Sequence, residues 1–301
     1  GTISGNNGGV KNPGMFFMYG GTITSNTANN GGGVDNAGTF TMDGGTITSN
    51  TANNGGGVYN DNAGRFIMYG GTITGNKAEQ TYGTEYGGGV YNQGTFNMYG
   101  GEITNNTATV GGGGVFNKGT FTMSGGEITS NSSESYGGGV CYSSSQLFKM
   151  SGTVNITENK VGTTPNNLYL WNGQQVSASG LTSGAEIGVT TQIVPINDSS
   201  VPITSDSVSV NCFSSDKSDY ETAIDENSKV VLKTKTAVEA PSITKQPQPV
   251  SVKVGETATF TVEAAGADLS YQWMVDKNDN RGFVDIAGAT SESYTLNAIS
   301  K

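Results

Sequence analysis

The sequence predicts an all-β protein, in which a right-handed, three-sided parallel β-helix is followed by an immunoglobulin-like β-sandwich. A unit of about 25 residues recurs along the first half of the chain, the first indication of a repeat fold. Glycine accounts for 47 of the 301 residues and charged residues for only 13%, a composition unlike that of helical proteins. No stretch of the chain shows helical periodicity in its apolar residues.

Each repeat contains three short runs in which apolar and polar residues alternate, bounded by Gly, Asn or Ser. The first run carries isoleucines that recur every 20 to 30 positions: Ile3, Ile23, Ile47, Ile73, Ile103, Ile128 and Ile156. The second run follows a glycine stretch and carries valines: Val10, Val34, Val58, Val90, Val115 and Val140. The third run, G-T-F-T-M or a variant, carries phenylalanines: Phe16, Phe40, Phe66, Phe96, Phe121 and Phe148. We expect three strands and three turns in each coil of residues 1–165.

Stacking explains why such short units fold. One unit cannot bury its own apolar face, but stacked units place Ile on Ile, Val on Val and Phe on Phe. Successive coils should rise by the strand spacing of about 4.8 Å. We expect the right-handed form because right-twisted strands joined by parallel crossovers prefer that hand. The phenylalanines, such as Phe40, Phe66 and Phe96, should face the core.

Two series of asparagines accompany the isoleucine and valine runs. The first series is Asn6, Asn26, Asn50, Asn76, Asn106, Asn131 and Asn159, and the second is Asn12, Asn36, Asn60, Asn92 and Asn117. Asparagine tolerates turn conformations, and its amide can bond to the same amide one coil above and below. We interpret both series as structural ladders, and the glycine runs as tight turns.

Between residues 166 and 235 the repeat loses its register, and we interpret this region as the C-terminal coils and the cap that a solenoid end requires. Its acidic residues are Asp216, Asp219, Glu221, Asp225 and Glu226. Solvated loop charge is the favoured interpretation of this group, and a calcium site is the alternative. Residues 236–249 contain three prolines and are predicted to be a linker.

Residues 250–301 resemble a truncated immunoglobulin-like domain. The resemblance rests on V-S-V-K-V-G-E-T-A-T-F-T-V-E, L-S-Y-Q-W and S-Y-T-L, with Trp273 at the place of the core tryptophan of that fold. Val262 stands where antibody domains have their first cysteine, so packing would replace the disulfide. The stretch D-K-N-D-N-R-G at 276–282 is interpreted as a hairpin turn, because it lacks the twelfth-position acid of a calcium loop.

A second resemblance concerns the repeats. The coil I-T-S-N-T-A-N-N-G-G-G-V-Y at 47–59 resembles the repeat of the chlamydial polymorphic outer membrane proteins, which pairs F-x-x-N with G-G-A-[ILV]. Here Ile stands in place of Phe and Gly in place of Ala. The segment N-L-Y-L-W-N-G at the start of 167–191 is similar to the stretch that closes β-helix repeats in surface proteins of Gram-positive gut bacteria. These resemblances cover residues 1–235 and imply a surface-exposed, adhesin-like protein.

Composition excludes several function classes. A net charge of -10 argues against binding to a nucleic-acid backbone. We expect no membrane insertion, because the chain contains no apolar run of 18 residues. Histidine is absent, which excludes His-dependent catalytic triads and His-containing zinc sites. The two cysteines, Cys141 and Cys212, are interpreted as free thiols. We therefore expect no metal and no cofactor.

Aromatic residues are the candidate ligand-binding groups. Tyr59, Tyr91 and Phe116 occupy one position in three consecutive coils, and we expect an exposed ladder of rings able to stack on sugars. Tyr69 and Tyr99 should form a second ladder. The longest coil carries an insertion at 77–86, and its Glu79, Tyr82, Glu85 and Tyr86 are expected to protrude near Tyr136, a further candidate ligand-binding residue. The alternative is that these aromatics simply suit β-strands.

Glu102 and Glu127 are the candidate catalytic residues. They occupy one outward position in adjacent coils, at about the 5 Å separation of a retaining glycosidase. We favour a non-enzymatic function, an adhesin-like protein of the bacterial cell surface whose rigid β-helix binds an extracellular glycan or a host surface protein as a monomer. The alternative is a β-helix glycoside hydrolase or polysaccharide lyase.

Overall fold

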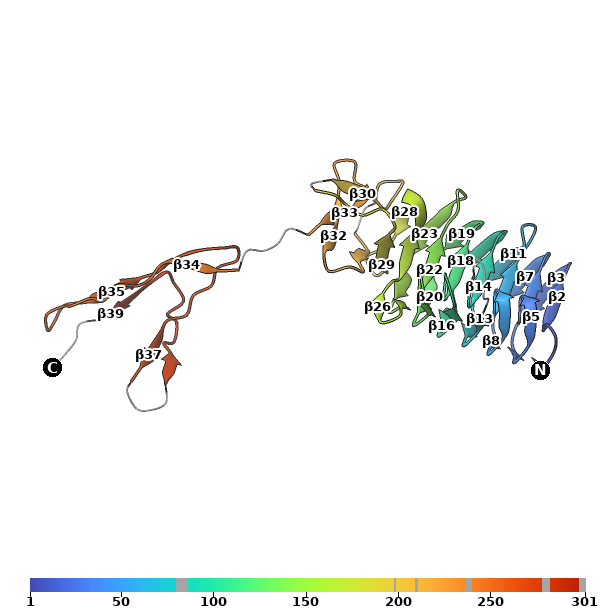
Figure 1. The fold of residues 1–301 in the computed structure, drawn as a ribbon, viewed down its shortest axis with the longest axis horizontal. Coiled ribbons are helices and arrows are strands. Elements are labelled where there is room, and N and C mark those ends of the chain that lie inside the picture. The colour runs from blue at the N-terminus through green and yellow to red at the C-terminus, as the bar shows by residue number, and fades with distance from the viewer. Residues whose placement is uncertain (80–85, 198, 209–210, 236–239, 278–281, 298–301) are drawn as a thin grey trace. The chain divides into compact units, whose positions relative to one another are not determined.

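The computed structural model divides the chain into two compact units, Gly1–Lys235 and Thr236–Lys301, which we call the solenoid unit and the C-terminal unit (Figure 1). The structure describes residues 1–79, 86–197, 199–208, 211–235, 240–277 and 282–297. The solenoid unit is a parallel β-solenoid of about 8 turns. Over the described residues, the one helical element is a short 3-10 helix, η1 (Trp171–Gly173), and no helix is long and apolar enough to cross a membrane.

A coil of the solenoid contains four strands rather than the three predicted. In one coil these are β8 (Thr46–Thr48), β9 (Thr51–Asn54), β10 (Val58–Asn60) and β11 (Arg65–Met68). The unpredicted strand is β9, with the sequence T-A-N-N. Alanine and asparagine are poor strand formers. The strand forms because the corresponding segments of the coils before and after it pair with it. We name the four rows of strands the isoleucine, alanine, valine and phenylalanine rows.

The rows stack coil upon coil. The isoleucine row comprises β1 (Thr2–Ser4), β4 (Thr22–Thr24), β8, β12 (Thr72–Thr74), β16 (Glu102–Thr104), β20 (Gly126–Thr129) and β24 (Val154–Thr157). The alanine row comprises β5 (Thr27–Asn30), β9, β13 (Lys77–Ala78), β17 (Thr107–Ala108), β21 (Ser132–Ser133) and β25 (Lys160–Val161), to which β26 (Thr164–Pro165) adds antiparallel. The valine row comprises β2 (Val10–Asn12), β6 (Val34–Asn36), β10, β14 (Val90–Asn92), β18 (Val115–Asn117), β22 (Val140–Tyr142) and β27 (Leu168–Leu170). The phenylalanine row comprises β3 (Met15–Met18), β7 (Thr39–Met42), β11, β15 (Thr95–Met98), β19 (Thr120–Met123), β23 (Phe148–Gly152) and β28 (Ser177–Leu181).

The end of the solenoid joins two of these rows. Strand β29 (Glu186–Thr191) pairs with both β24 and β27, so the isoleucine and valine rows belong to one 16-stranded sheet. Strand β31 (Phe213–Ser215) pairs with β29. A three-stranded sheet of β30 (Ser200–Pro202), β33 (Val230–Thr234) and β32 (Tyr220–Ile224) completes the unit. These irregular strands occupy the region where a cap was expected.

The inward side chains form the predicted core. Phe40, Phe66, Phe96, Phe121 and Phe148 are all 0% exposed. Successive rings along Phe40, Phe66 and Phe96 stack with centroids 4.8 and 4.6 Å apart and planes within 5°. The isoleucine, valine and methionine positions pack in the same cluster. The register assigned from the sequence spacing is therefore confirmed.

Both predicted asparagine ladders are present. Along the first, each Nδ2 donates to the Oδ1 of the next coil at 2.9 to 3.1 Å, through Asn26, Asn50, Asn76, Asn106, Asn131, Asn159 and finally Asn167. Along the second, the distances are 2.6 to 2.7 Å, through Asn12, Asn36, Asn60, Asn92 and Asn117. The first ladder ends on Asp216, whose Oδ1 accepts from Asn167 Nδ2 at 2.6 Å. All its side-chain amides thus point the same way, toward a carboxylate.

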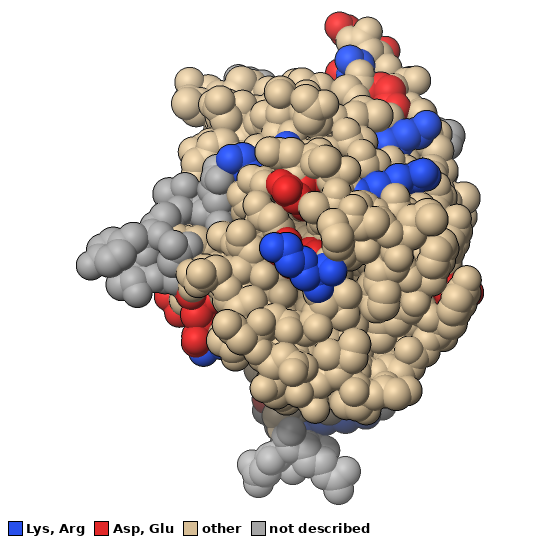
Figure 2. Space-filling view, turned by 90° about the vertical axis from the view of Figure 1, so that its right-hand side faces the viewer, with Lys and Arg blue, Asp and Glu red and all other residues tan. Residues whose placement is uncertain are grey.

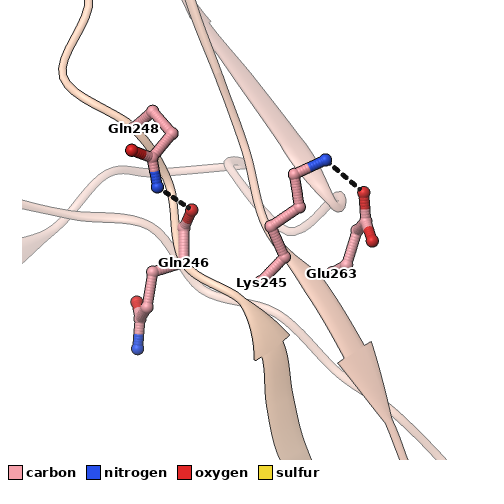
Figure 3. A network of polar contacts seen from close by, with 4 residues as sticks. All are labelled: Lys245, Gln246, Gln248 and Glu263. Atoms are coloured by element: carbon pink, nitrogen blue, oxygen red, sulfur yellow. Dashed lines mark hydrogen bonds and ion pairs between the residues drawn. The ribbon is translucent and has the colours of Figure 1, made fainter.

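The C-terminal unit contains three antiparallel strand pairs within its described residues. They are β34 (Ser242–Lys245) with β36 (Glu263–Ala265), β35 (Ala258–Thr261) with β39 (Ser293–Leu296), and β37 (Met274–Asp276) with β38 (Phe283–Asp285). Strand β34 lies inside the segment predicted to be a linker. Lys245 Nζ binds Glu263 Oε1 at 2.7 Å across the first pair, and nearby Gln248 Nε2 donates to the Gln246 carbonyl (Figure 3).

Candidate functional site

The predicted ladder of Tyr59, Tyr91 and Phe116 is present, but it is not exposed. The ring centroids are 5.4 and 5.6 Å apart and the rings are nearly parallel. Tyr91 is only 4% exposed and Phe116 only 2%, so the expectation of an open aromatic strip is wrong for these two residues. The strip is covered because the row continues into Cys141 and Tyr169, and because the loop at Gly111 lies against the Phe116 ring.

Tyr136 and Trp171 complete this aromatic cluster. The Tyr136 ring lies 5.4 Å from Tyr169 and 4.9 Å from Trp171, so Tyr136 packs on its neighbours. Burial, with Cys141 and Tyr136 close by, raises the pKa of Tyr169 to about 12. The cluster is a small second core on the outer side of the valine row. Its most exposed member along the row is Tyr59, whose hydroxyl donates to Gln93 Oε1 at 2.8 Å.

The insertion of the longest coil also differs from the prediction that its side chains protrude. Tyr82 and Glu85 lie outside the described residues. Tyr86 is 2% exposed and packs against Ala78 and Ala108, so its expected protrusion is wrong. The physical reason is the small side chains of Ala78 and Ala108 in the alanine row, which leave room for the Tyr86 ring to pack against them.

Phe17 and Tyr19 form an exposed stacked pair within the first coil, and Tyr69 and Tyr99 form one across successive coils. The rings of Tyr69 and Tyr99 stack with centroids 5.1 Å apart and planes 14° apart, and the two residues remain 54% and 46% exposed. Each tyrosine directly follows a strand of the phenylalanine row and precedes a Gly-Gly turn. Gly71 has φ of +86°, and a Cβ there would lie 2.8 Å from the Gly45 carbonyl oxygen, so the turn requires glycine. We call Tyr69 and Tyr99 the tyrosine pair.

Two carboxylates lie near the tyrosine pair, one in the coil of Tyr99 and one in the next coil. Glu102 begins β16, three residues after Tyr99, and is the register partner of Glu127 in β20. Both glutamates are exposed, as predicted. Neither lines any of the four cavities described for this structure. They lie on an open strand face, beside Thr72 on one side and Asn155 on the other.

A groove of about 450 Å³ lies on the alanine row, in a place that the sequence analysis did not identify. It is lined by Lys77, Thr107, Ala108, Thr109, Ser132, Ser133, Glu134 and Gly162. Strands β5 and β9 extend over four residues with paired asparagines, whereas β13, β17 and β21 extend over only two. The groove lies where the row has lost its last two strand residues. The sequence signal that could have revealed the groove is the change from T-A-N-N in the earlier coils to T-A and S-S in the later coils.

The acidic residues of the cap are engaged in local structure. Asp216 accepts from the Asn167 backbone and side chain and from Thr190 Oγ1, and burial raises its pKa. Asp225 Oδ1 accepts from the backbone of Asn227 and Lys229 in a turn. In the described part of the chain, no group of three or more His, Cys, Asp or Glu residues is placed to hold a metal ion. Residues 278–281 of the D-K-N-D-N-R-G stretch lie outside that part.

Charge is sparse on the surface. The face in Figure 2 carries isolated acidic and basic side chains on a mostly uncharged background.

Comparisons with known proteins give one partial similarity. No protein-family model and no solved structure matches the chain. Among curated proteins, endoglucanase C of Cellulomonas fimi is 40% identical over 63 residues. This match covers 21% of the present chain and 6% of the length of that protein.

Proposed function

We propose that this protein is a bacterial cell-surface protein, displayed outside the cell, whose solenoid is a rigid scaffold that binds an extracellular glycan without cleaving it. The observation that carries the proposal is the tyrosine pair, two exposed rings held 5.1 Å apart on successive coils. Exposed aromatic faces stack on apolar faces of ligands, and their hydroxyls offer hydrogen bonds. Because the coils fix both rings before binding, little conformational entropy is lost on binding.

Two further facts support a sugar as the ligand. Glu102 follows Tyr99 across the Gly-Gly turn and Glu127 lies beside it in the next coil, and carboxylates accept hydrogen bonds from hydroxyl groups. The partial similarity to a protein named as an endoglucanase supports a relation to carbohydrate. The finer architecture belongs to the same proposal: a right-handed solenoid, followed by an immunoglobulin-like domain in which Trp273 packs near Phe260 and Tyr294.

The decisive experiment is a glycan array, followed by calorimetry with each glycan that binds. Tyr69→Ala should weaken binding by about 1 kcal/mol, and Tyr69→Ala with Tyr99→Ala by more. Tyr19→Ala is the matched control, because Tyr19 is an exposed tyrosine of the first coil outside the pair. Unchanged binding by the double variant would refute the proposed site.

The second candidate function is glycoside hydrolysis by Glu102 and Glu127, which their adjacent register favours. Against it, both carboxylates lie on an open face, whereas catalytic pairs are usually enclosed in a cleft. Release of reducing sugar from a bound glycan, abolished by Glu102→Gln with Glu127→Gln, would establish the enzyme and overturn the binding-only proposal.

A further inference from the structure

The groove on the alanine row has the lining of a ligand site. Thr107 and Ser132 are register partners in β17 and β21, so their hydroxyls lie about 4.8 Å apart along the rod. Thr109 also lines the groove with a hydroxyl group. Ser133 is the register partner of Ala108, and its buried hydroxyl donates to the Tyr136 carbonyl oxygen at 2.8 Å. A hydroxyl both donates and accepts hydrogen bonds. The groove therefore presents hydroxyl groups of Thr107, Thr109 and Ser132 beside the apolar Ala108.

The charges at the groove bear on the class of ligand. Lys77, at one end, forms an ion pair with Glu79, so its positive charge is already balanced. Glu134 also lines the groove and adds a carboxylate. Lys160, the register partner of Ser132 in β25, is exposed beside the groove, so two basic and two acidic side chains balance there. The groove therefore has no net charge that would favour an anionic polysaccharide over a neutral ligand with many hydroxyl groups.

We infer that this groove is a second binding site, for a segment of a neutral oligosaccharide lying along the rod axis. The lining spans four coils, from Lys77 to Gly162, a length of about 14 Å at the strand spacing. The site does not include the tyrosine pair. The isoleucine row separates the two around each coil, so each site can be altered without touching the other.

The test uses cellohexaose, xylohexaose, mannohexaose and an oligogalacturonate as probes, in isothermal titration calorimetry. The Tyr69→Ser, Tyr99→Ser variant of the full chain serves as the background, so that binding at the tyrosine pair does not contribute. At least one neutral hexasaccharide should bind this background. Thr107→Val keeps the side-chain shape, and Ser132→Val adds one methyl group. Together they remove two hydroxyls and should weaken binding about tenfold or more.

The matched control is Thr51→Val, which changes the same outward position of the alanine row outside the groove, and should alter affinity less than about twofold. A second variant, Gly162→Asn, fills the groove: a Cβ at Gly162 meets nothing within 4 Å, and asparagine tolerates its φ of +59°. It should also weaken binding.

Three results would overturn the inference: no neutral probe binds the background variant, only the oligogalacturonate binds, or the Thr107→Val, Ser132→Val variant binds unchanged. If wild type binds a neutral probe and the background variant does not, the proposed groove site is refuted and the proposed site at the tyrosine pair is supported. If the background variant binds as well as wild type, the proposed site at the tyrosine pair is refuted and the groove site is supported.

Discussion

The solenoid unit and the C-terminal unit are both all-β, yet they differ in the exposure of their apolar side chains. In the solenoid, Phe40, Phe66, Phe96, Phe121 and Phe148 of the phenylalanine row are 0% exposed. In the C-terminal unit, Phe283 is 69% exposed, Val254 66% and Ile243 55%. The solenoid buries its rings because each coil supplies the same residue at the same register to its neighbours. The three strand pairs of the C-terminal unit have no such repetition, and two-stranded ribbons bury little by themselves.

The largest effect on stability is expected for Phe96→Ala in the middle of the solenoid, which tests this difference. The ring is fully buried between Phe66 and Phe121, so its loss should leave a cavity and cost about 3–5 kcal/mol of unfolding free energy. Denaturant unfolding followed by Trp171 fluorescence, with Trp273 replaced by Phe, reports on the solenoid alone. The counterpart in the C-terminal unit is Val254→Ala, followed by Trp273 fluorescence with Trp171 replaced by Phe. It should change stability by less than about 0.5 kcal/mol. Equal effects of the two changes would contradict the comparison.

The second test concerns polar burial, which the described residues show mainly in the solenoid. Asn106 is 0% exposed, accepts from Asn76 and donates to Asn131 at 3.0 Å each. Asn106→Ala should cost about 1–3 kcal/mol, because a buried donor of Asn76 and a buried acceptor of Asn131 lose a partner. Asn97→Ala, at an outward position of β15, is the control and should cost less. The same unfolding assay applies, and a cost no larger than that of the control would show that the ladder contributes no net stability.

Sequence spacing was sufficient to predict the core and both ladders, because each follows the period of the repeat. The burial of Tyr91, Phe116 and Tyr86 could not be predicted in this way. Spacing shows which residues share a row, whereas the segments that cover a row are the irregular connections, such as the loop at Gly111. The groove was not predicted for the same reason, because it lies where the strands of the alanine row become shorter and the spacing of the repeat does not show this. The tyrosine pair was predictable because the Gly-Gly turn beside it repeats in every coil.

A smaller effect is expected from pH at the capped end of the solenoid. Burial raises the pKa of Asp216 above its value in the unfolded chain, although hydrogen bonds from Asn167 and Thr190 oppose this. The folded state therefore holds the proton more tightly, and its stabilisation is complete below the unfolded pKa and lost as pH rises through the folded pKa. Asp216→Asn should remove this pH dependence. Stability should be measured from pH 3 to 7, with Asp219→Asn as a charge-matched control.

The opposite outcome for Asp216 is equally informative. If wild-type stability rises relative to Asp216→Asn over the same pH range, the hydrogen bonds at the end of the ladder outweigh burial. The one-way amide ladder would then stabilise the carboxylate, as a chain of aligned hydrogen-bond dipoles can.

The smallest expected effect is in the C-terminal unit, at the ion pair of Lys245 and Glu263. The atoms are 2.7 Å apart, but the side chains are 63% and 57% exposed, so water and salt screen the attraction. A double-mutant cycle with Lys245→Ala and Glu263→Ala should give a coupling below about 1 kcal/mol that shrinks further in 0.5 M salt. Trp273 fluorescence, with Trp171 replaced by Phe, follows this unit alone.

The matched cycle in the solenoid uses Asn131→Ala and Asn159→Ala, whose amides bond at 2.9 Å and are shielded from water. The coupling of this cycle should be larger and insensitive to salt. A coupling in the ion pair that equals the solenoid value would mean that the two units do not differ in how far they exclude water from their polar contacts.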